Sequence, residues 1–482
     1  MPRPHPTALL VTLAAVLGVA ALVAPGRAEA FCGFYVSGGT TKLYNNATQV
    51  VLMRDGLRTI QSMQNSYQGP PEDFAMVVPV PVVLKKEDVK TLPAAVFAKV
   101  DVLDAPRLVE YWEQDPCPRP LPSYKSSVKY DAAPRSAMGK GSGAAPPPAA
   151  FVEVKARFSV GEYDVIILES NDAATLDAWL RERKYQIPDG AQTVLAPYID
   201  QGMYFFVAKV DVKKVKFEAG RAALSPLRFH YDDKKFFLPV RLGMLNANGP
   251  QDLIVHILAR NQRYEVANLP NTTIPTNIDV KDGVRRSFGA FYNALFDATQ
   301  KKHPRAVVTE YSWSASSCDP CPGPTLDGGD LLGLGADVLP GQVAGGFTLT
   351  RLHARYTKEE LTEDLVFQVA PPIIGGREVY VDRNEIETGT KPSSVNNFQG
   401  RYAIRHLWTG PIACAHPERG VWGGPPHGRG EEPPWAARDL AFAPRKGVEL
   451  QNVVRSDVPE VDIKAKSTTK GALKRGRKGA KK

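Results

Sequence analysis

Residues 118–150 are the segment that most constrains how this chain can fold. The segment ends in GKGSGAAPPPAA, which has no hydrophobic periodicity and is rich in proline, alanine and glycine. Such a sequence cannot contribute to a packed core, so it is expected to act as a linker or an insertion. The chain must therefore build its hydrophobic core from the sequence on either side of it.

The chain has 482 residues, which is more than one hydrophobic core usually serves. We predict an α+β fold with two β-rich lobes, packed helices and a loop-rich C-terminal segment. In chain order, the predicted parts are a signal peptide (1–30), an N-terminal β-rich lobe (31–117), the linker (118–150), a central α+β lobe (151–313), a loop-rich segment that contains cysteines (314–463) and a disordered basic tail (464–482).

The N-terminus has the pattern of a secretory signal peptide. Arg3 lies in a short basic region, residues 8–24 are apolar and uncharged, and residues 28–30 (AEA) match a small-x-small cleavage site. Cleavage there starts the mature chain at Phe31 and leaves no transmembrane anchor, because no later apolar segment is long enough to span a membrane. We therefore expect a secreted or periplasmic protein.

The C-terminal tail, residues 464–482, contains nine lysines and arginines and no acidic residue. Most of the net charge of +9 comes from this tail, so the body of the chain is close to neutral and no specific nucleic-acid partner is expected. The tail is too polar to bury a core. Either it is a solvated end that keeps the protein soluble, or it makes salt-sensitive contacts with anionic polymers of the cell envelope.

Local patterns predict several helices and strands. Asp55-Gly56 lies between two runs with apolar residues and predicts a hairpin over residues 49–63. Apolar residues recur with helical spacing from Phe288 to Phe296 and predict a helix that packs on the core. Further helices are predicted over 171–184 and over 94–113 with a break at Pro106, and further strands over 203–212, 225–232, 235–245, 252–261 and 306–313.

Cys318 and Cys321 form a C-x-x-C pair in the stretch SWSASSCDPCPGPTL, directly after a predicted strand. In a thioredoxin-like redox site a helix would begin at this pair, because its N-terminus lowers the pKa of the first thiol. Residues 322–324 (PGP) are a poor start for a helix. This argues against a catalytic redox role.

A structural zinc site is a second interpretation of the pair. Cys318 and Cys321 have the spacing of half a zinc site, and Cys414 with His416 could complete a Cys₃His set. The separation of the two pairs in the sequence matches no compact zinc finger. The other histidines considered are scattered singly and are expected to be packed or surface residues: His230, His256, His303, His353 and His406.

Structural disulfides are the interpretation that an oxidising compartment favours. The candidates are Cys32, Cys117, Cys318, Cys321 and Cys414. Five cysteines cannot all pair within one chain, so at least one is left over. The sequence does not decide between a small ring joining Cys318 to Cys321 and bonds from these two to distant cysteines.

No motif of a known catalytic site is present. The chain lacks the G-x-S-x-G, H-E-x-x-H and P-loop patterns, and the sequence identifies no catalytic or cofactor-binding residue. The DGGD of residues 327–330 is interpreted as a flexible turn or a weak calcium site. We expect a non-catalytic binding or structural module of the cell envelope, without a cofactor. The alternative is an extracytoplasmic enzyme or zinc protein built around the C-x-x-C pair, Cys414 and His416.

Several segments resemble one protein family when they are taken together and in order: YQGPPEDFAMVVPVP, FSVGEYDVIILES, LPVRLGMLNANGPQDLIVHILAR, FGAFYNALF, LTRLHARY and NFQGRYAIRHLW. The family is an uncharacterised group of secreted bacterial proteins, domain-of-unknown-function family twenty-three thirty, frequent in myxobacteria and their relatives. The resemblance covers nearly all of the mature chain. It implies an extracytoplasmic location and a shared fold, but no activity. The family's Cys-Gly-Gly-Phe-Phe-Cys type of opening is reduced here to FCGFYV, in which only Cys32 remains.

Overall fold

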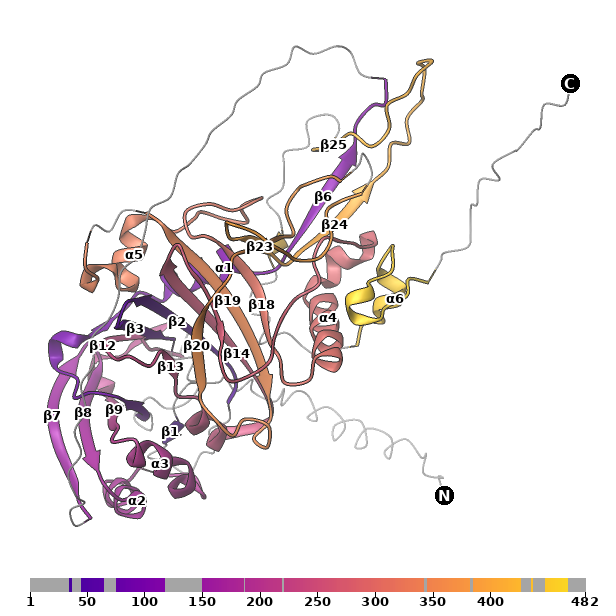
Figure 1. The fold of residues 1–482 in the computed structure, drawn as a ribbon. Helices are drawn as coiled ribbons and strands as arrows, with labels where there is room; N and C mark the ends of the chain where they lie inside the picture. The colour runs from indigo at the N-terminus through magenta and orange to yellow at the C-terminus, as the bar shows by residue number, and fades with distance from the viewer. Residues whose placement is uncertain are drawn as a thin grey trace, which may run out of the picture.

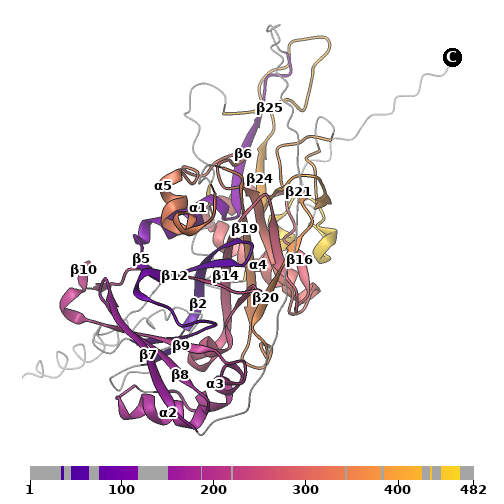
Figure 2. The ribbon, with the colours of Figure 1, turned by 60° about the vertical axis from the view of Figure 1, so that its left-hand side comes forward.

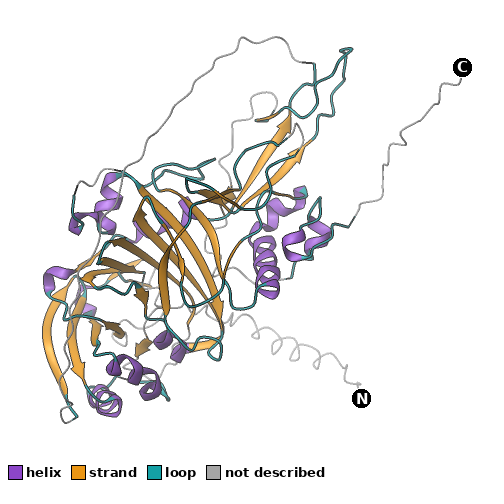
Figure 3. Cartoon of the chain, viewed as in Figure 1, coloured by secondary structure: helices purple, strands orange, loops and turns teal. Residues whose placement is uncertain are grey.

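The computed structural model describes residues 34–36, 45–64, 75–117, 150–185, 187–218, 221–341, 345–381, 385–425, 435–436 and 447–466. The fold of these residues is α+β, as predicted, and Figures 1 and 3 show its sheets and helices. The predicted signal peptide, nearly all of the linker and most of the basic tail lie outside the described residues. In this part of the chain no helix combines the length and the apolar character needed to cross a bilayer.

The largest sheet, here called the central sheet, runs through the middle of the molecule (Figure 1). Its strands, from one edge to the other, are β22 (Lys391–Pro392), β21 (Ile373–Gly375), β23 (Asn397–Gln399), β18 (Val307–Ser314), β19 (Phe347–Tyr356), β14 (Ala247–Arg260), β2 (Asn45–Asp55), β3 (Arg58–Met63), β12 (Leu227–Asp232) and β5 (Val89–Thr91), with β16 (Asn271–Thr273) beside β18. β14 pairs in parallel with β2 and antiparallel with β19. The predicted hairpin is confirmed as β2 and β3, with Gly56 in the turn at φ +55°.

A second sheet, the flanking sheet, packs against one face of the central sheet. Its strands, in order, are β1 (Phe34–Val36), β4 (Ala75–Val80), β9 (Tyr204–Val210), β8 (Tyr163–Ser170) and β7 (Val152–Val160). A third sheet, the distal sheet, extends away from the first two (Figures 1 and 2). It consists of β17 (Ile278–Asp279), β24 (Arg401–His406), β6 (Arg107–Glu113), β25 (Trp422–Gly423) and β26 (Trp435–Ala436).

Two smaller sheets and the helices complete the described fold. The smaller sheets contain β13 (Phe237–Leu238), β20 (Leu365–Ala370) and β15 (Arg263–Val266), and β10 (Lys216–Glu218) with β11 (Arg221–Ala223). The α-helices are α1 (Ala94–Asp104), α2 (Ala173–Glu182), α3 (Ala191–Asp200), α4 (Phe288–Lys302), α5 (Gly328–Leu334) and α6 (Leu450–Val453). The predicted helices α2 and α4 are confirmed, and the side chain of Asp172 caps α2 by accepting the Thr175 N–H.

The layers follow from the alternation of side chains along the strands. Leu253, Val255 and Ile257 of β14 face the flanking sheet, and together with its inward side chains they form the main hydrophobic core. The outer face of the flanking sheet is covered by α2 and α3. On the opposite face of the central sheet, α1 and α5 pack together in one hydrophobic cluster, and α4 packs in another (Figure 1).

Strands from all the predicted folded segments share these sheets. β2 and β3 come from the predicted N-terminal lobe, β12 and β14 from the central lobe and β19 from the segment after residue 314, yet all five lie in the central sheet. The predicted divisions at residues 117 and 313 therefore mark changes in sequence character, and they do not coincide with edges of the sheets.

Two local predictions need correction. The stretch over 94–113 is helical only as far as Asp104, and after Pro106 it becomes strand β6, whose side chains alternate between the two faces of the distal sheet. The strand predicted over 235–245 shortens to β13, because Pro239 lacks an N–H for a ladder and residues 241–246 turn into a 3₁₀ helix.

Candidate functional site

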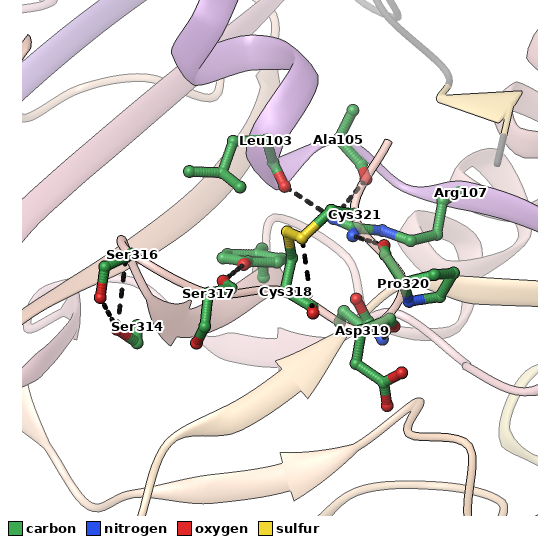
Figure 4. Close-up of a disulfide and its surroundings, with 12 residues drawn as sticks. Leu103, Ala105, Arg107, Ser314, Ser316, Ser317, Cys318, Asp319, Pro320 and Cys321 are labelled. Atoms are coloured by element: carbon green, nitrogen blue, oxygen red, sulfur yellow. Dashed lines mark hydrogen bonds between the residues drawn. A yellow bond between two sulfur atoms is a disulfide. The ribbon is translucent and has the colours of Figure 1, made fainter. Parts of the chain in front are cut away.

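The C-x-x-C loop lies at the exit of β18, as predicted, and its two cysteines form a disulfide. Cys318 is half-buried against the hydrophobic cluster that includes α1, whereas Cys321 is exposed. Figure 4 shows the disulfide next to the end of α1. The Pro320 carbonyl accepts a hydrogen bond from Nη1 of Arg107 at 2.8 Å, and Nη2 of the same side chain donates to the Leu103 carbonyl at 2.7 Å. Arg107 thus fastens the loop to α1.

A second disulfide joins Cys117 to Cys414, which are 297 residues apart in the chain and 5.6 Å apart between their Cα atoms. It ties the segment that follows β6 to the loop that follows β24. Nearby, the buried carboxylate of Glu113 accepts hydrogen bonds from Arg419 and from the Gly420 N–H. The two disulfides use four of the candidate cysteines, and Cys32 lies outside the described residues.

The residues predicted for a zinc site are therefore divided between two disulfides. Cys318 is bonded to Cys321, Cys414 is bonded to Cys117, and His416 is exposed. Zinc binds cysteine as the thiolate, which a disulfide does not offer. In this oxidised form the structure does not bring the predicted residues together as a ligand set.

The segment after the C-x-x-C pair contains no helix until α5 begins at Gly328. Asp327 and Asp330 of the DGGD stretch form a capping box at the start of α5, and Lys99 of α1 forms ion pairs with both carboxylates. These contacts assign DGGD to helix capping, which corrects its interpretation as a flexible turn.

The most unusual feature of the described residues is an ion network between the central sheet and the helices α1 and α4. Its members are ionisable, each is at most 3 % exposed, and none was predicted as a site residue: Asp101, Asp104, Asp252, His256, Glu310, Arg351 and His353. They come from α1, β14, β18 and β19. The network lies between two hydrophobic clusters on the face of the central sheet opposite the flanking sheet.

Arg351 is the centre of one half of the ion network. Its Nε donates to Glu310 at 2.7 Å, and its Nη1 donates to Asp101 at 2.6 Å and to Asp104 at 2.9 Å. The second oxygen of Asp104 lies 2.6 Å from Nδ1 of His256. Burial lowers the pKa of Arg351, but the charges of Asp101, Asp104 and Glu310 outweigh it and raise that pKa well above its usual value. The guanidinium is therefore permanently charged.

His353 is the centre of the other half. Its Nδ1 lies 2.6 Å from Glu310 and its Nε2 lies 3.0 Å from Asp252, so each ring nitrogen faces a carboxylate. The ring stacks on Phe296 of α4 at 3.8 Å between centroids. Burial lowers the pKa of His353, but Glu310 and Asp252 outweigh it and raise the pKa above its ordinary value. An imidazolium with two donated protons satisfies both carboxylates at once.

Glu310 connects the two halves because of a β-bulge. The register between β18 and β19 shifts between Thr309 and Tyr311, which leaves Glu310 without an opposite residue and directs its side chain into the network. Tyr292 of α4 donates to the same carboxylate. Burial raises the pKa of Glu310, but His353, Arg351 and Tyr292 outweigh it and bring the pKa down to about 2.

Asp101, Asp104 and His256 each offer a ligand atom within 4.8 Å of the others, a spacing that could hold a metal ion. Arg351 already donates to both carboxylates, however, so its guanidinium takes the place of a bound cation. A metal ion there must displace a buried arginine, and the donor set does not fit one while Arg351 is in place.

The sequence contains a weak signal for this network. Arg351, His353 and Arg355 alternate along β19, and Asp101 and Asp104 are three residues apart on one face of α1. Charged residues at every second position of a strand normally indicate a solvated face. Only the packing of α1 and α4 over this face buries it, and that packing is not readable from the local sequence.

The fold and the site define a class of protein: an α+β protein with two sheets packed face to face, fastened by disulfides and containing a buried ion network. Residues 26–368 match the family model DUF2330, described as an uncharacterized protein conserved in bacteria, so the chain belongs to this family, as the sequence resemblance indicated. No curated protein and no solved structure matches the chain.

Proposed function

We propose that this protein is a secreted or periplasmic binding or structural module of the bacterial cell envelope, and that it is not an enzyme. The observation that carries the proposal is the state of the ion network. A catalytic acid or base must come within hydrogen-bond reach of its substrate. Glu310, Arg351 and His353 are excluded from solvent and make their hydrogen bonds to other protein side chains. This arrangement supports a role in holding the fold together.

The extracytoplasmic location is supported by the N-terminal sequence and by the two disulfides, since such bonds persist in oxidising compartments. Expression of the full chain in a Gram-negative host, followed by fractionation and mass spectrometry, tests it. The expected result is a protein in the periplasm or medium that begins at Phe31. A chain that retains residues 1–30 in the cytosol contradicts the proposal.

The state of the cysteines is tested by counting thiols in the denatured, unreduced protein and measuring bound metal in the same sample. Two disulfides leave one of the five cysteines, so we expect no more than one thiol per chain and no stoichiometric zinc. The C318S/C321S variant serves as a control that leaves the Cys117–Cys414 bond unchanged. Stoichiometric zinc together with four additional thiols contradicts the proposal and favours the zinc protein built from Cys318, Cys321, Cys414 and His416.

For the basic tail we propose a contact with anionic envelope polymers, supported by its charge and by the near neutrality of the rest of the chain. Co-sedimentation with purified anionic cell-wall polymer tests this contact, comparing the full mature chain with a chain that ends at residue 463. We expect binding only with the tail and a steep loss of binding as salt rises. Equal binding of both chains contradicts the contact.

A further inference from the structure

Two buried arginines lie side by side where the distal sheet meets the central sheet. Arg107 of β6 and Arg401 of β24 are direct partners in the parallel register of these strands, so their side chains leave the same face of the distal sheet. Both residues are 0 % exposed. Like charges on neighbouring strands repel each other, and a buried charge without a counter-ion is strongly destabilising. The position therefore needs a source of negative charge.

Arg107 is largely satisfied by the protein. In addition to Leu103 and Pro320, its guanidinium donates to the Ala105 carbonyl at 3.3 Å. Two of these three carbonyls lie at the C-terminal end of α1, where the helix dipole places partial negative charge. Its Nε has no acceptor among the described residues.

Arg401 is not satisfied in this way. Its Nη2 donates to the hydroxyl of Tyr111 at 2.5 Å, but Nε and Nη1 have no acceptor in the part of the chain that the structure describes. Three of the five N–H groups of a guanidinium are on these two atoms. Tyr380 lies in the same region and its buried hydroxyl also has no partner among the described residues. Neither arginine forms an ion pair with a described carboxylate.

The charges of Asp104 and Asp319 act on Arg107 from a distance, but the hydrogen bonds of the carboxylates in this region go to other groups. Asp104 is bonded to Arg351 and His256. Glu378 accepts from Tyr111 at 3.2 Å and is exposed to solvent, while Asp319 accepts the N–H of Glu378. These last two belong to the segments that cover the arginines, namely the C-x-x-C loop and residues 376–381.

We propose that Arg401 is the main ligand of a binding site for a small oxyanion, that is, a phosphate, sulfate or carboxylate group. Its unpartnered N–H groups supply charge-assisted donors, the Tyr380 hydroxyl supplies a neutral one and Arg107 adds positive charge. The site deepens the proposed role as a binding module by naming the class of ligand.

Calorimetric titration of the mature protein with sulfate, phosphate and acetate at constant ionic strength tests the site, with chloride as the background salt. The matched variants are R401Q, the conservative R401K, and R58Q, which removes an arginine from an exposed ion pair with Asp232. Melting curves of each variant in the same salts separate site binding from the general stabilisation that sulfate and phosphate give to any folded protein.

We expect saturable binding of at least one oxyanion to the wild type and to R58Q. Charge-assisted hydrogen bonds are roughly twice as strong as neutral ones, so binding to R401Q should weaken by about tenfold or more. R401K keeps the charge but loses the planar fork of the guanidinium, so its binding should weaken less than that of R401Q. The anion that binds most tightly identifies whether the ligand group is a phosphate, a sulfate or a carboxylate.

Two results overturn the proposal. One is the absence of saturable binding to the wild type, which means that Arg401 is hydrated by water only. This result is measured on the wild type alone, so it remains valid even if R401Q does not fold. The other is equal binding to R401Q and to the wild type. Both leave the disulfide and location tests unaffected, so failure of the oxyanion site is distinguishable from failure of the proposed function.

Discussion

The two faces of the central sheet come from the same strands but differ in their chemistry. Leu253 and Val255 of β14, together with Leu352 of β19, point into the mainly apolar core against the flanking sheet. On the other side of the same two strands, Arg351 and His353 belong to the ion network under α1 and α4. The first face is held mainly by area removed from water, whereas the second combines two hydrophobic clusters with matched charges.

The two faces differ in how strictly their side chains determine the fold. Apolar packing is non-directional and tolerates substitutions that preserve volume. A buried ion pair adds little net stability by itself, because both ions lose their hydration, but it tolerates the loss of neither partner. We infer that the network fixes the positions of α1 and α4 on the sheet, since Asp101 and Tyr292 must each meet one specific partner.

The largest effect is expected for Arg351→Met. The substitution leaves Asp101, Asp104 and Glu310 buried without their shared cation, so it should lower the free energy of unfolding by about 3–5 kcal/mol. Urea unfolding of the purified protein measures it. The control is Arg58→Met, whose exposed ion pair should contribute about 0–1 kcal/mol. Equal losses for the two variants contradict the claim that the buried network cannot lose a partner.

The adjacent residue on the other face provides the second prediction. Leu352→Ala should lower the free energy of unfolding by about 2–5 kcal/mol, because it removes a buried side chain from the core between the sheets. The loss should be the same at every pH at which the protein folds, since no titratable group is removed. A loss that changes with pH, measured in the same urea series, indicates that the two faces are coupled.

The smallest effect is expected at the solvent edge of the network. Asp297 is exposed and pairs with Arg355, whose Nε also donates to Asp252 at 2.6 Å. Asp297→Asn should therefore change the free energy of unfolding by about 0–1 kcal/mol. A loss comparable to that of Arg351→Met shows that the network extends to the surface.

The sequence predicted the elements whose signals are local. The turn at Gly56, the helix α2 and the apolar stripe of α4 each lie within one short window, and each is confirmed. The C-x-x-C loop was also placed correctly at the end of a core strand. In each case the signal needed no knowledge of the rest of the fold.

The sequence could not predict what depends on pairing between distant segments. β2 pairs with β14 and β6 pairs with β24 across hundreds of residues, and no local pattern specifies these partners. The partner of Cys117 depends on the second of these pairings. The sequence predicts His353 as an isolated packed or surface residue. Its carboxylate partners come from β14 and β18, which are distant in the sequence, so no local pattern points to them.

The central claim is that the network is structural and that His353 is a buried cation in it, beside Arg351. The pKa of His353 is raised in the folded state, so its charged form stabilises the fold. This stabilisation is complete below the unfolded pKa of about 6.5 and is lost as pH rises through the folded pKa. Glu310, with a pKa of about 2, contributes above its unfolded pKa of about 4.3 and loses this contribution as pH falls.

The most direct measurement is the free energy of unfolding of the wild type and of His353→Gln from about pH 5 to about pH 9. The account predicts that the wild-type advantage over the variant is largest near the acidic end and shrinks as pH rises above about 6.5. The difference between the curves isolates His353 from other titrating groups. A constant difference across the range contradicts the account, because it means that His353 is not held as an imidazolium between Glu310 and Asp252.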